Sequence, residues 1–216
     1  MQTDLNNAAI IRFLKTKFKG AGFIDALKIK YRSLISPFIS LIKMVQPGEK
    51  AGDIGCGSGQ FALLLTEFAQ PSFLYGIEIS PQLIENANSL FSTITEPPHH
   101  FEVYDGVHFP QKMAEMDILF LIDVLHHVPK DAQETFISAL TERMKPGARL
   151  VLKDINAGSP LVYFNKMHDL IFATETGNEM SFDRAKYLLQ ANGLNIIEQE
   201  KRTMYVYPHY TLVAKK

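Results

Sequence analysis

The chain has 216 residues, of which 46% are hydrophobic and 21% are charged, and its formal net charge at pH 7 is −1. This balance is that of an ordinary globular protein, and it provides no overall attraction for nucleic acid. A single cysteine excludes a disulfide framework, and no signal-like leader or membrane-spanning apolar run is apparent, so we expect a cytoplasmic protein.

The first part of the chain is basic and helical in pattern. Residues 1–45 hold eight basic and two acidic residues, a local charge of +6 that leaves −7 for the remainder. Apolar residues recur at helical spacing over residues 5–18 and 23–45, and Pro37 is expected to break or kink the second stretch. We therefore expect residues 1–46 to form a helical lid or cap.

The pattern changes over residues 47–216, where short apolar strands alternate with helices. Strands are expected at about 50–54, 73–79, 100–104, 116–122 and 148–153, with helices at about 58–69, 80–92 and 131–144. This alternation predicts a doubly wound α/β fold, in which helices cover both faces of a parallel sheet.

The end of the chain adds two helices and two further strands. Helices are expected at about 160–173 and 181–192, and strands at 194–200 and 204–214. Only a few residues separate these last strands, which is typical of an antiparallel hairpin. The sequence therefore predicts a seven-stranded α/β sheet with an antiparallel C-terminal hairpin and additional N-terminal helices.

A glycine-rich segment, DIGCGSG at residues 53–59, joins the first expected strand to a helix. Glycines allow the backbone to turn sharply and let a ligand approach it closely, while the helix presents free N–H groups. Ligands of open α/β sheets bind at the carboxyl ends of the strands. The loop is therefore predicted to border a ligand site.

The loop spacing is G-x-G-x-G, because Gln60 stands where the dinucleotide motif requires its third glycine. Glu78 follows the second strand, where a carboxylate can accept hydrogen bonds from ribose hydroxyls. Asp105 and Gly106 follow the third strand, where a carboxylate can accept from an adenine amino group. Together these groups can bracket an adenosine that carries no diphosphate.

Five segments, in this order, resemble the motifs of class I S-adenosylmethionine-dependent methyltransferases. They are GDIGCGSG (52–59), GIEIS (76–80), YDG (104–106), MDILFLIDVLHHVP (116–129) and KPGARLVLKD (145–154). Within that family the chain is similar to the ubiquinone/menaquinone methylase-like branch of small-molecule enzymes. One departure is the pair Ala51–Gly52, where bulky aliphatic residues are usual, and it is expected to weaken the packing of the first strand.

The resemblance implies S-adenosylmethionine as the cofactor and a methyltransferase activity. The implied cofactor-binding residues are Asp53, Gly55, Cys56, Gly57, Gly59, Glu78, Ile79, Asp105, Gly106, Asp123 and Val124. Asp123 is expected near the methionine part of the cofactor. Cys56 is expected to be a small packing residue and not a nucleophile, because no basic residue adjoins it.

Three histidines are candidate general bases for methyl transfer to a hydroxyl. His126 and His127 follow the fourth strand, and His168 lies on the helix expected at 160–173. Six residues are candidates for an acceptor pocket: Tyr163, Phe164, Phe172, Tyr205, Tyr207 and His209. No metal site is expected, since the paired histidines lack a third or fourth converging ligand.

The expected reaction is O- or C-methylation of a small-molecule or lipid-like acceptor by in-line transfer, although N-methylation stays open. The basic N-terminal helices are expected to lie over the acceptor site and to contact an anionic membrane or an acyl carrier. The alternative is a non-catalytic protein that binds S-adenosylmethionine and regulates a partner. A nicotinamide-dependent oxidoreductase and a nucleic-acid methyltransferase are weaker alternatives, because their motifs are missing.

Overall fold

The computed structural model of the protein describes residues 5–17, 37–159, 177–205 and 207–216. The strands are β1 (Lys50–Ile54), β2 (Phe73–Glu78), β3 (His99–Val103), β4 (Ile118–Ile122), β5 (Arg149–Ile155), β6 (Asn195–Met204) and β7 (Tyr207–Lys215). The helices are α1 (Asn7–Lys17), α3 (Phe38–Ile42), α4 (Gln60–Phe68), α5 (Pro81–Phe91), α6 (Gln133–Arg143) and α8 (Phe182–Ala191), with short 3₁₀ turns η1 (Gln111–Glu115) and η2 (Leu125–His127).

All seven strands join one sheet in the order β3-β2-β1-β4-β5-β7-β6. The first five strands run parallel to one another, whereas β7 is antiparallel to both β5 and β6. The predicted doubly wound sheet with its antiparallel C-terminal hairpin is therefore confirmed. The predicted strand positions are also confirmed to within a few residues, and β6 is the strand that extends furthest beyond its expected end.

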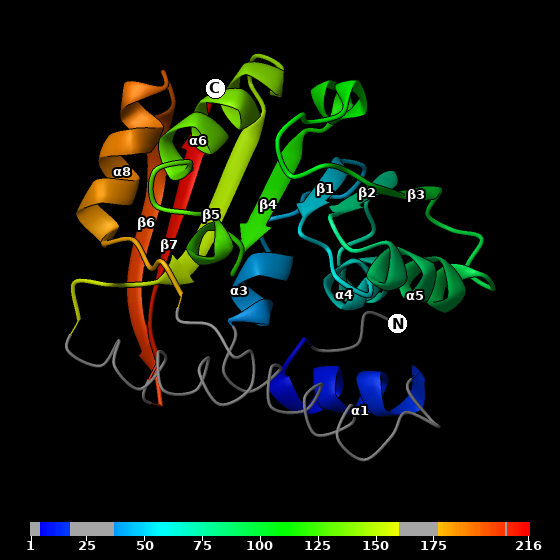
Figure 1. The fold of residues 1–216 in the computed structure, drawn as a ribbon. Helices are drawn as coiled ribbons and strands as arrows, with labels where there is room; N and C mark the ends of the chain where they lie inside the picture. The colour runs from blue at the N-terminus through cyan, green and yellow to red at the C-terminus, as the bar shows by residue number, and fades with distance from the viewer. Residues whose placement is uncertain (1–4, 18–36, 160–176, 206) are drawn as a thin grey trace.

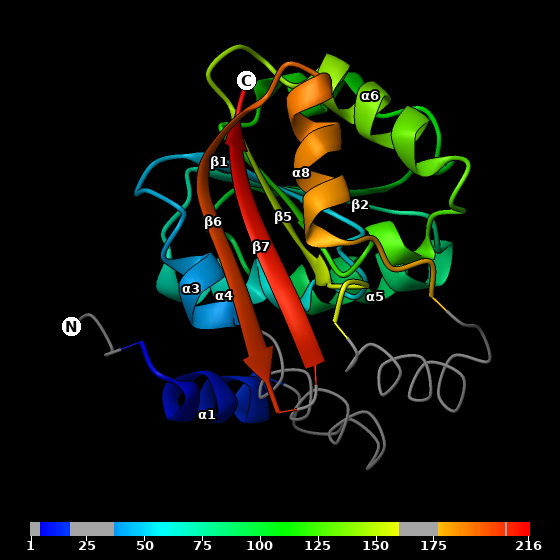
Figure 2. The same cartoon turned by 90° about the vertical axis from the view of Figure 1, so that its left-hand side faces the viewer.

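Helices cover both faces of this sheet (Figures 1 and 2). On one face the side chains of Leu119, Leu121 and Leu152 pack with α6 and α8, and on the other Phe120 and Val151 pack with α3, α4 and α5. Successive residues of β4 thus enter opposite cores, as the alternation of a strand requires. The side chains of Ser80 and Ser181 cap α5 and α8 at the starts predicted for them.

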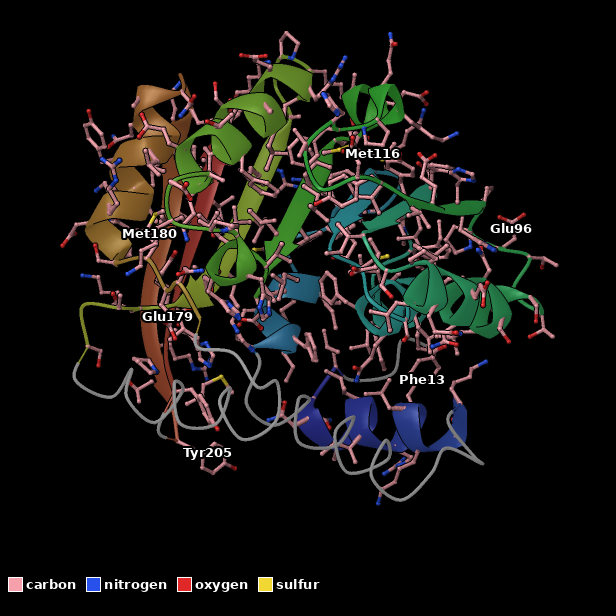
Figure 3. The ribbon with its side chains drawn as sticks, viewed as in Figure 1. Phe13, Glu96, Met116, Glu179, Met180 and Tyr205 are labelled. Atoms are coloured by element: carbon pink, nitrogen blue, oxygen red, sulfur yellow. The ribbon has the colours of Figure 1, made fainter. Side chains whose placement is uncertain are left out.

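The N-terminal segment contributes α1, which packs on the helical layer and not on the sheet itself. Ile10 and Leu14 are buried, and the ring of Phe13 lies 5.7 Å from that of Phe68 on α4 (Figure 3). The helix α3 begins directly after Pro37, as the predicted break required. None of the described helices is long and apolar enough to cross a membrane. The helix expected at 160–173 lies outside the described residues.

The expected weakness of β1 at Ala51 and Gly52 is not found. A Cβ atom added to Gly52 would lie 2.5 Å from Cδ2 of Leu119 and 3.1 Å from Cγ of Met116. The bulky residues thus stand on and before the neighbouring strand β4, where they fill the space above the glycine. Gly76 of β2 is covered in the same way by Phe101 of β3.

We expect Gly76→Ala to destabilise the protein by about 1–3 kcal/mol, because the added methyl group overpacks a closed core. Its Cβ would lie 2.4 Å from Cδ1 of Phe101 and 2.9 Å from Sγ of Cys56. Urea unfolding would measure the change. In the background of Phe101→Leu the same substitution should cost less, and equal costs in the two backgrounds would contradict this packing.

Asp117 joins three strands at the opposite end of the sheet, just before β4. Its carboxylate accepts from the backbone N–H of Lys50 at 2.8 Å and from Nζ of Lys145 at 2.6 Å. Its own carbonyl oxygen accepts from the N–H of Arg149 at 2.9 Å. Partial burial would raise the pKa of Asp117, but these hydrogen bonds outweigh it and lower the pKa below the usual 3.8.

A carboxylate with a lowered pKa in the folded state stabilises that state above its unfolded pKa, and the stabilisation is lost as the pH falls through the folded pKa. We therefore expect Asp117→Asn to destabilise the protein at pH 7 and to reduce the loss of stability on acidification below pH 4. Urea unfolding at several pH values would test this, with the exposed Asp131→Asn as control. Parallel pH curves for the wild type and Asp117→Asn would contradict it.

Candidate active site

The order of the sheet places its switch point at β1 and β4. From β1 the chain continues to β2 and β3 on one side of the sheet. It then returns to β4 and β5 on the other side of β1. The carboxyl ends of β1 and β4 are therefore the switch point at which open α/β sheets bind ligands. The glycine-rich loop follows β1, and the residues from Asp123 to Val128 follow β4 at the same edge.

The glycine-rich loop adopts backbone conformations that favour glycine at three positions. Gly55, Gly57 and Gly59 have φ values of 72°, 54° and 78°. A Cβ atom on Gly55 would lie 2.4 Å from Cγ2 of Val124, so the loop packs tightly on the residues after β4. A Cβ atom on Gly57 would meet nothing within 4 Å. The middle of the loop therefore offers open space for a ligand.

Glu78 fastens this loop to the end of β2. Its Oε2 accepts from the N–H of Gly57 at 3.1 Å, and its Oε1 accepts from the N–H groups of Ile79 and Ser80 at 2.8 and 3.2 Å. A carboxylate offers about four lone-pair positions, so at least one stays available for a hydroxyl donor. The predicted ribose-binding residue is thus held rigidly beside the glycine loop.

Exposed residues that follow β2 and β3 lie next to Glu78. Ile79 is 61% exposed, and a Cβ on Gly106 would lie 3.4 Å from its Cγ2. The carboxylate of Asp105 accepts from the N–H groups of Val107 and His108 at 2.9 and 2.6 Å, and from Nδ1 of His108 at 2.6 Å. These contacts lower its pKa. Asp105 therefore organises its own loop, and its predicted contact with adenine stays a prediction.

Asp53 and Cys56 lie beneath the glycine loop, with 6% of each residue exposed. Burial of the thiol, and after it the carboxylates of Asp53 and Glu78, raise the pKa of Cys56. The thiol is held in its neutral form, and thiolates are the nucleophilic form of cysteine. This supports the prediction that Cys56 is a packing residue.

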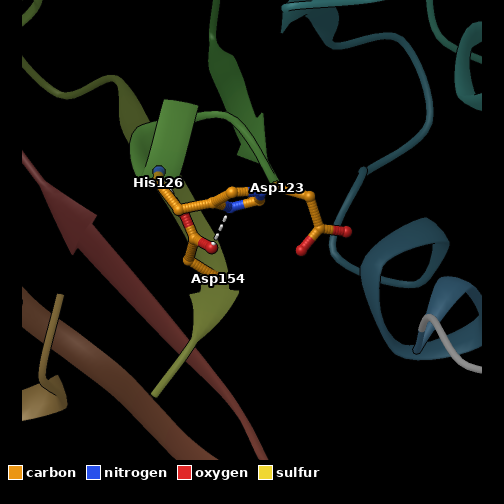
Figure 4. A group of neighbouring side chains, drawn as sticks. All are labelled: Asp123, His126 and Asp154. Atoms are coloured by element: carbon orange, nitrogen blue, oxygen red, sulfur yellow. Dashed lines mark hydrogen bonds and ion pairs between the residues drawn. The ribbon is translucent and has the colours of Figure 1, made fainter. Parts of the chain in front are cut away.

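His126 forms a buried pair with Asp154, which lies in the neighbouring strand β5 (Figure 4). Nδ1 of His126 lies 2.6 Å from Oδ1 of Asp154, and the backbone N–H of His126 donates to Oδ2 at 3.1 Å. The carboxylate thus fixes both the tautomer and the orientation of the ring, with Nε2 directed to the opposite side. His127 is exposed, and the centre of its ring lies 4.0 Å from that of His126.

Asp123 forms a second charged pair, with Lys153. Nζ of this fully buried lysine donates to the two carboxylate oxygens at 2.6 and 2.8 Å. Burial would raise the pKa of Asp123, but Lys153 and, less strongly, His209 and His126 outweigh it and lower the pKa. Asp123 also has a positive φ of 55°, which a non-glycine residue rarely adopts and which often marks a functional site.

Ligand-type atoms of Asp123, His126 and Asp154 lie within 4.8 Å of one another, a grouping that the sequence did not reveal. The carboxylate of Asp123 already holds Lys153, and Asp154 already holds His126. The hydrogen bonds from Lys153 thus occupy both carboxylate oxygens of Asp123, the atoms that this residue would offer to another cation.

A comparison with protein families now identifies the region that carries these groups. Residues 52–147 match the profile of the family described as "Methyltransferase domain". Residues 52–147 are therefore similar to a methyltransferase domain. The match begins in β1 and includes the glycine loop, Glu78 and His126, and it agrees with the resemblance predicted from the sequence motifs.

Two curated relatives match this chain over more than half of their own length. The chain is 27% identical over 178 residues to the 27-O-demethylrifamycin SV methyltransferase of Amycolatopsis mediterranei (strain S699), covering 80% of this chain and 63% of that protein. It is 28% identical over 155 residues to the O-methyltransferase rstn1 of Aspergillus nomiae, covering 70% of this chain and 66% of that one. The chain therefore spans less than two thirds of the length of each.

Among solved structures, the fold is similar to that of magnesium protoporphyrin IX methyltransferase (ChlM) from Synechocystis PCC 6803 with bound SAH. The TM-score is 0.72 at 19% identity, and the match covers 98% of this chain and 95% of that one. Likeness at this identity concerns the fold, and it agrees with the sheet order described above.

The structure brings together most of the residues predicted for the site of the methyltransferase domain. It adds Asp154 and Lys153, whose roles the sequence did not reveal, although both are the last residues of the motif KPGARLVLKD (145–154). Tyr207 and His209 are buried with their rings 6.3 Å apart, whereas Tyr205 is 74% exposed at the end of the hairpin. His168, Tyr163, Phe164 and Phe172 lie outside the described residues.

Proposed function

We propose that the protein is an S-adenosylmethionine-dependent methyltransferase that methylates a hydroxyl group of a small-molecule or lipid-like acceptor. The observation that carries this proposal is the buried pair of His126 and Asp154 at the carboxyl edge of the sheet. It follows β4, the strand adjacent to β1 and its glycine loop. A base thus lies at the same switch point as the cofactor loop.

The residues present fit the adenosine part of this cofactor. Glu78 retains lone-pair capacity for a ribose hydroxyl, and the exposed side chain of Ile79 offers an apolar surface to an adenine ring. Gly57 leaves open space above the loop. Gln60 stands where the dinucleotide motif requires its third glycine, which favours an adenosyl sulfonium compound over a dinucleotide.

The bound cofactor supplies an electrophilic methyl group, so the protein has to align the acceptor, exclude water and remove a proton. We propose that Nε2 of His126 accepts the proton of the acceptor hydroxyl. Asp154 holds the ring in the required tautomer and stabilises the imidazolium that forms. Lys153 pairs with the neighbouring carboxylate of Asp123. Asp154 is therefore the carboxylate that stabilises the imidazolium.

The acceptor is proposed to be a small hydroxylated molecule, as the names of the two O-methyltransferase relatives suggest. Lipid-like quinols belong to this class, and the predicted similarity to quinone methylases is kept here as part of the proposal. Buried aromatic residues near the pair of His126 and Asp154, such as Tyr207 and His209, suit a planar or apolar acceptor.

The experiment that tests this function combines binding with turnover. S-adenosylmethionine or S-adenosylhomocysteine at about 100 times its Kd should stabilise the protein by roughly 2.7 kcal/mol in thermal unfolding, and NAD should not. Radiolabelled S-adenosylmethionine is then offered with a panel of phenols, quinols and hydroxylated lipids. Binding without transfer to any acceptor would favour the alternative of a non-catalytic regulatory protein, and stabilisation by NAD alone would favour an oxidoreductase.

A basic lid is the second part of the proposal. Arg12, Lys15 and Lys17 are exposed on α1, while its apolar side is buried on the helical layer. Such a helix can attract an anionic lipid surface, with about 1 kcal/mol for each basic residue near that surface.

We expect the triple variant Arg12→Gln/Lys15→Gln/Lys17→Gln to lose most of its binding to vesicles containing phosphatidylserine at low salt. Co-sedimentation would measure it, with neutral phosphatidylcholine vesicles and the exposed Lys130→Gln as controls. The triple variant retains the buried residues Ile10 and Leu14, so its fold should survive. Equal binding by the variant and the wild type would contradict a membrane role for α1.

A further inference from the structure

The side chain of Gln133 lies at a junction between the loop that carries His126 and the segment that precedes α8. Gln133 is the first residue of α6 and is 5% exposed. Its Nε2 donates to the carbonyl oxygen of Asn178 at 2.7 Å, of Leu125 at 3.1 Å and of Val128 at 3.3 Å. The two N–H groups of one carboxamide are thus shared among three backbone carbonyl groups from two separate parts of the chain.

The same junction holds His126 through its backbone. The N–H of Asn178 donates to the carbonyl oxygen of His126 at 2.7 Å, and the N–H of His126 donates to Asp154 at 3.1 Å. A Cβ atom on Gly177 would lie 3.3 Å from Cδ2 of His126, so this segment also packs against the edge of the ring. His126 is therefore held through its backbone N–H, through its carbonyl oxygen and along its ring.

The segment that contains Asn178 is fastened at both of its sides. Beyond the contact with His126, the N–H of Ala157 donates to the carbonyl oxygen of Met180 at 3.3 Å, which ties the segment to the loop after β5. Glu179 and Met180 accordingly lie between the η2 turn and the start of α8 (Figure 3). This segment thus bridges the loop after β4, which carries His126, and the loop that follows Asp154 and the end of β5.

We infer that Gln133 is a positioning residue for methyl transfer: its carboxamide holds the η2 loop and Asn178 together and so keeps the ring of His126 aligned with Asp154. This inference rests on the proposed role of His126 as the base. Gln133 is buried behind the loop and acts through His126. A base displaced by as little as 1 Å can lower the rate roughly 100-fold, which is why such a contact matters.

The first test follows the proton that His126 shares with Asp154, which needs no acceptor substrate. Proton NMR of the S-adenosylhomocysteine complex should show a low-field Nδ1–H signal, absent in His126→Asn, as expected of a 2.6 Å bond to a carboxylate. Gln133→Leu should weaken or shift this signal. Thr141→Val is the matched control, because it removes another buried side-chain hydrogen bond from α6, to Ser138 at 2.9 Å.

The second test follows turnover with the acceptor found in the screen. Gln133→Leu should lower kcat by roughly 10- to 100-fold and leave the Kd of S-adenosylhomocysteine within about twofold of the wild type. Gln133→Glu keeps the size of the side chain but places a carboxylate against three carbonyl groups, so it should act in the same direction. It keeps the test decisive if the leucine variant does not fold.

Each outcome bears on the inference. A Nδ1–H signal and a kcat that respond to Gln133 variants no more than to Thr141→Val would overturn it, as would loss of folding in both Gln133 variants, which indicates a purely structural role. If instead Gln133→Leu alters the signal while His126→Asn retains full turnover, Gln133 does position the ring of His126, but His126 is not the base. The two failures are therefore distinguishable.

Discussion

Substitution of His126 by alanine is expected to lower kcat by about 10²- to 10⁴-fold, the usual contribution of a general base. The imidazole is held by Asp154 at 2.6 Å and by backbone contacts at both ends of its peptide unit, so it cannot be replaced by its neighbour. The affinity for S-adenosylhomocysteine should stay within a few-fold of the wild type, because the adenosine-binding residues follow other strands. Steady-state kinetics and titration calorimetry would measure the two effects.

His127→Ala is the matched control, since this adjacent histidine is exposed and is expected to change kcat only modestly. Asp154→Asn should lower kcat as well, because an amide cannot stabilise the imidazolium. For the wild type, kcat/KM should rise with pH as the base loses its proton and then level off. If His126→Ala keeps the wild-type kcat and the same pH profile, His126 is not part of the mechanism.

Glu78→Ala is expected to weaken the binding of S-adenosylmethionine and S-adenosylhomocysteine by at least 100-fold. Hydrogen bonds to a charged group contribute about 1.5–3 kcal/mol each, and the variant loses those to the ribose as well as the three that organise the loop. Titration calorimetry with S-adenosylhomocysteine would give the two dissociation constants. Thermal unfolding without ligand would show whether the loop alone is destabilised.

The ribose contact can be separated from the support of the loop by changing the ligand. The wild type should bind S-adenosylhomocysteine more tightly than its 2′-deoxy analogue, and Glu78→Ala should remove most of that difference. If the variant loses equal affinity for both ligands, Glu78 acts only through the backbone of Gly57, Ile79 and Ser80. If it binds both as well as the wild type does, the cofactor does not lie where we propose.

Much of the fold could be predicted because its local signals agree with one another. The apolar runs of β1 to β5, the glycine loop and the serine caps of α5 and α8 each determine their own segment. The weak packing expected at Gly52 was wrong for a reason that is not local. The compensating Leu119 and Met116 stand 67 and 64 residues further along the chain and are brought to Gly52 only by the pairing of β1 with β4.

The candidate site was predictable where a residue acts through its place at the end of a strand, as with Glu78. It was not predictable where two residues act as a pair. The sequence does not reveal which of His126 and His127 turns inward, because that depends on a carboxylate 28 residues away on β5. Gln133 carries no sequence signal either, since its three acceptors are backbone carbonyl groups, which any residue type offers, and one of them belongs to Asn178, 45 residues away.

The strand β7 is synthesised after every other strand of the sheet, yet it lies between β5 and β6. Until residues 207–215 are available, β5 has no partner on one side and β6 has no partner at all. A chain interrupted before β7 therefore exposes open strand edges and lacks Tyr210, which is fully buried opposite Asp154 of β5. Premature termination, even close to the end of the message, should yield an aggregation-prone product and not a shortened enzyme.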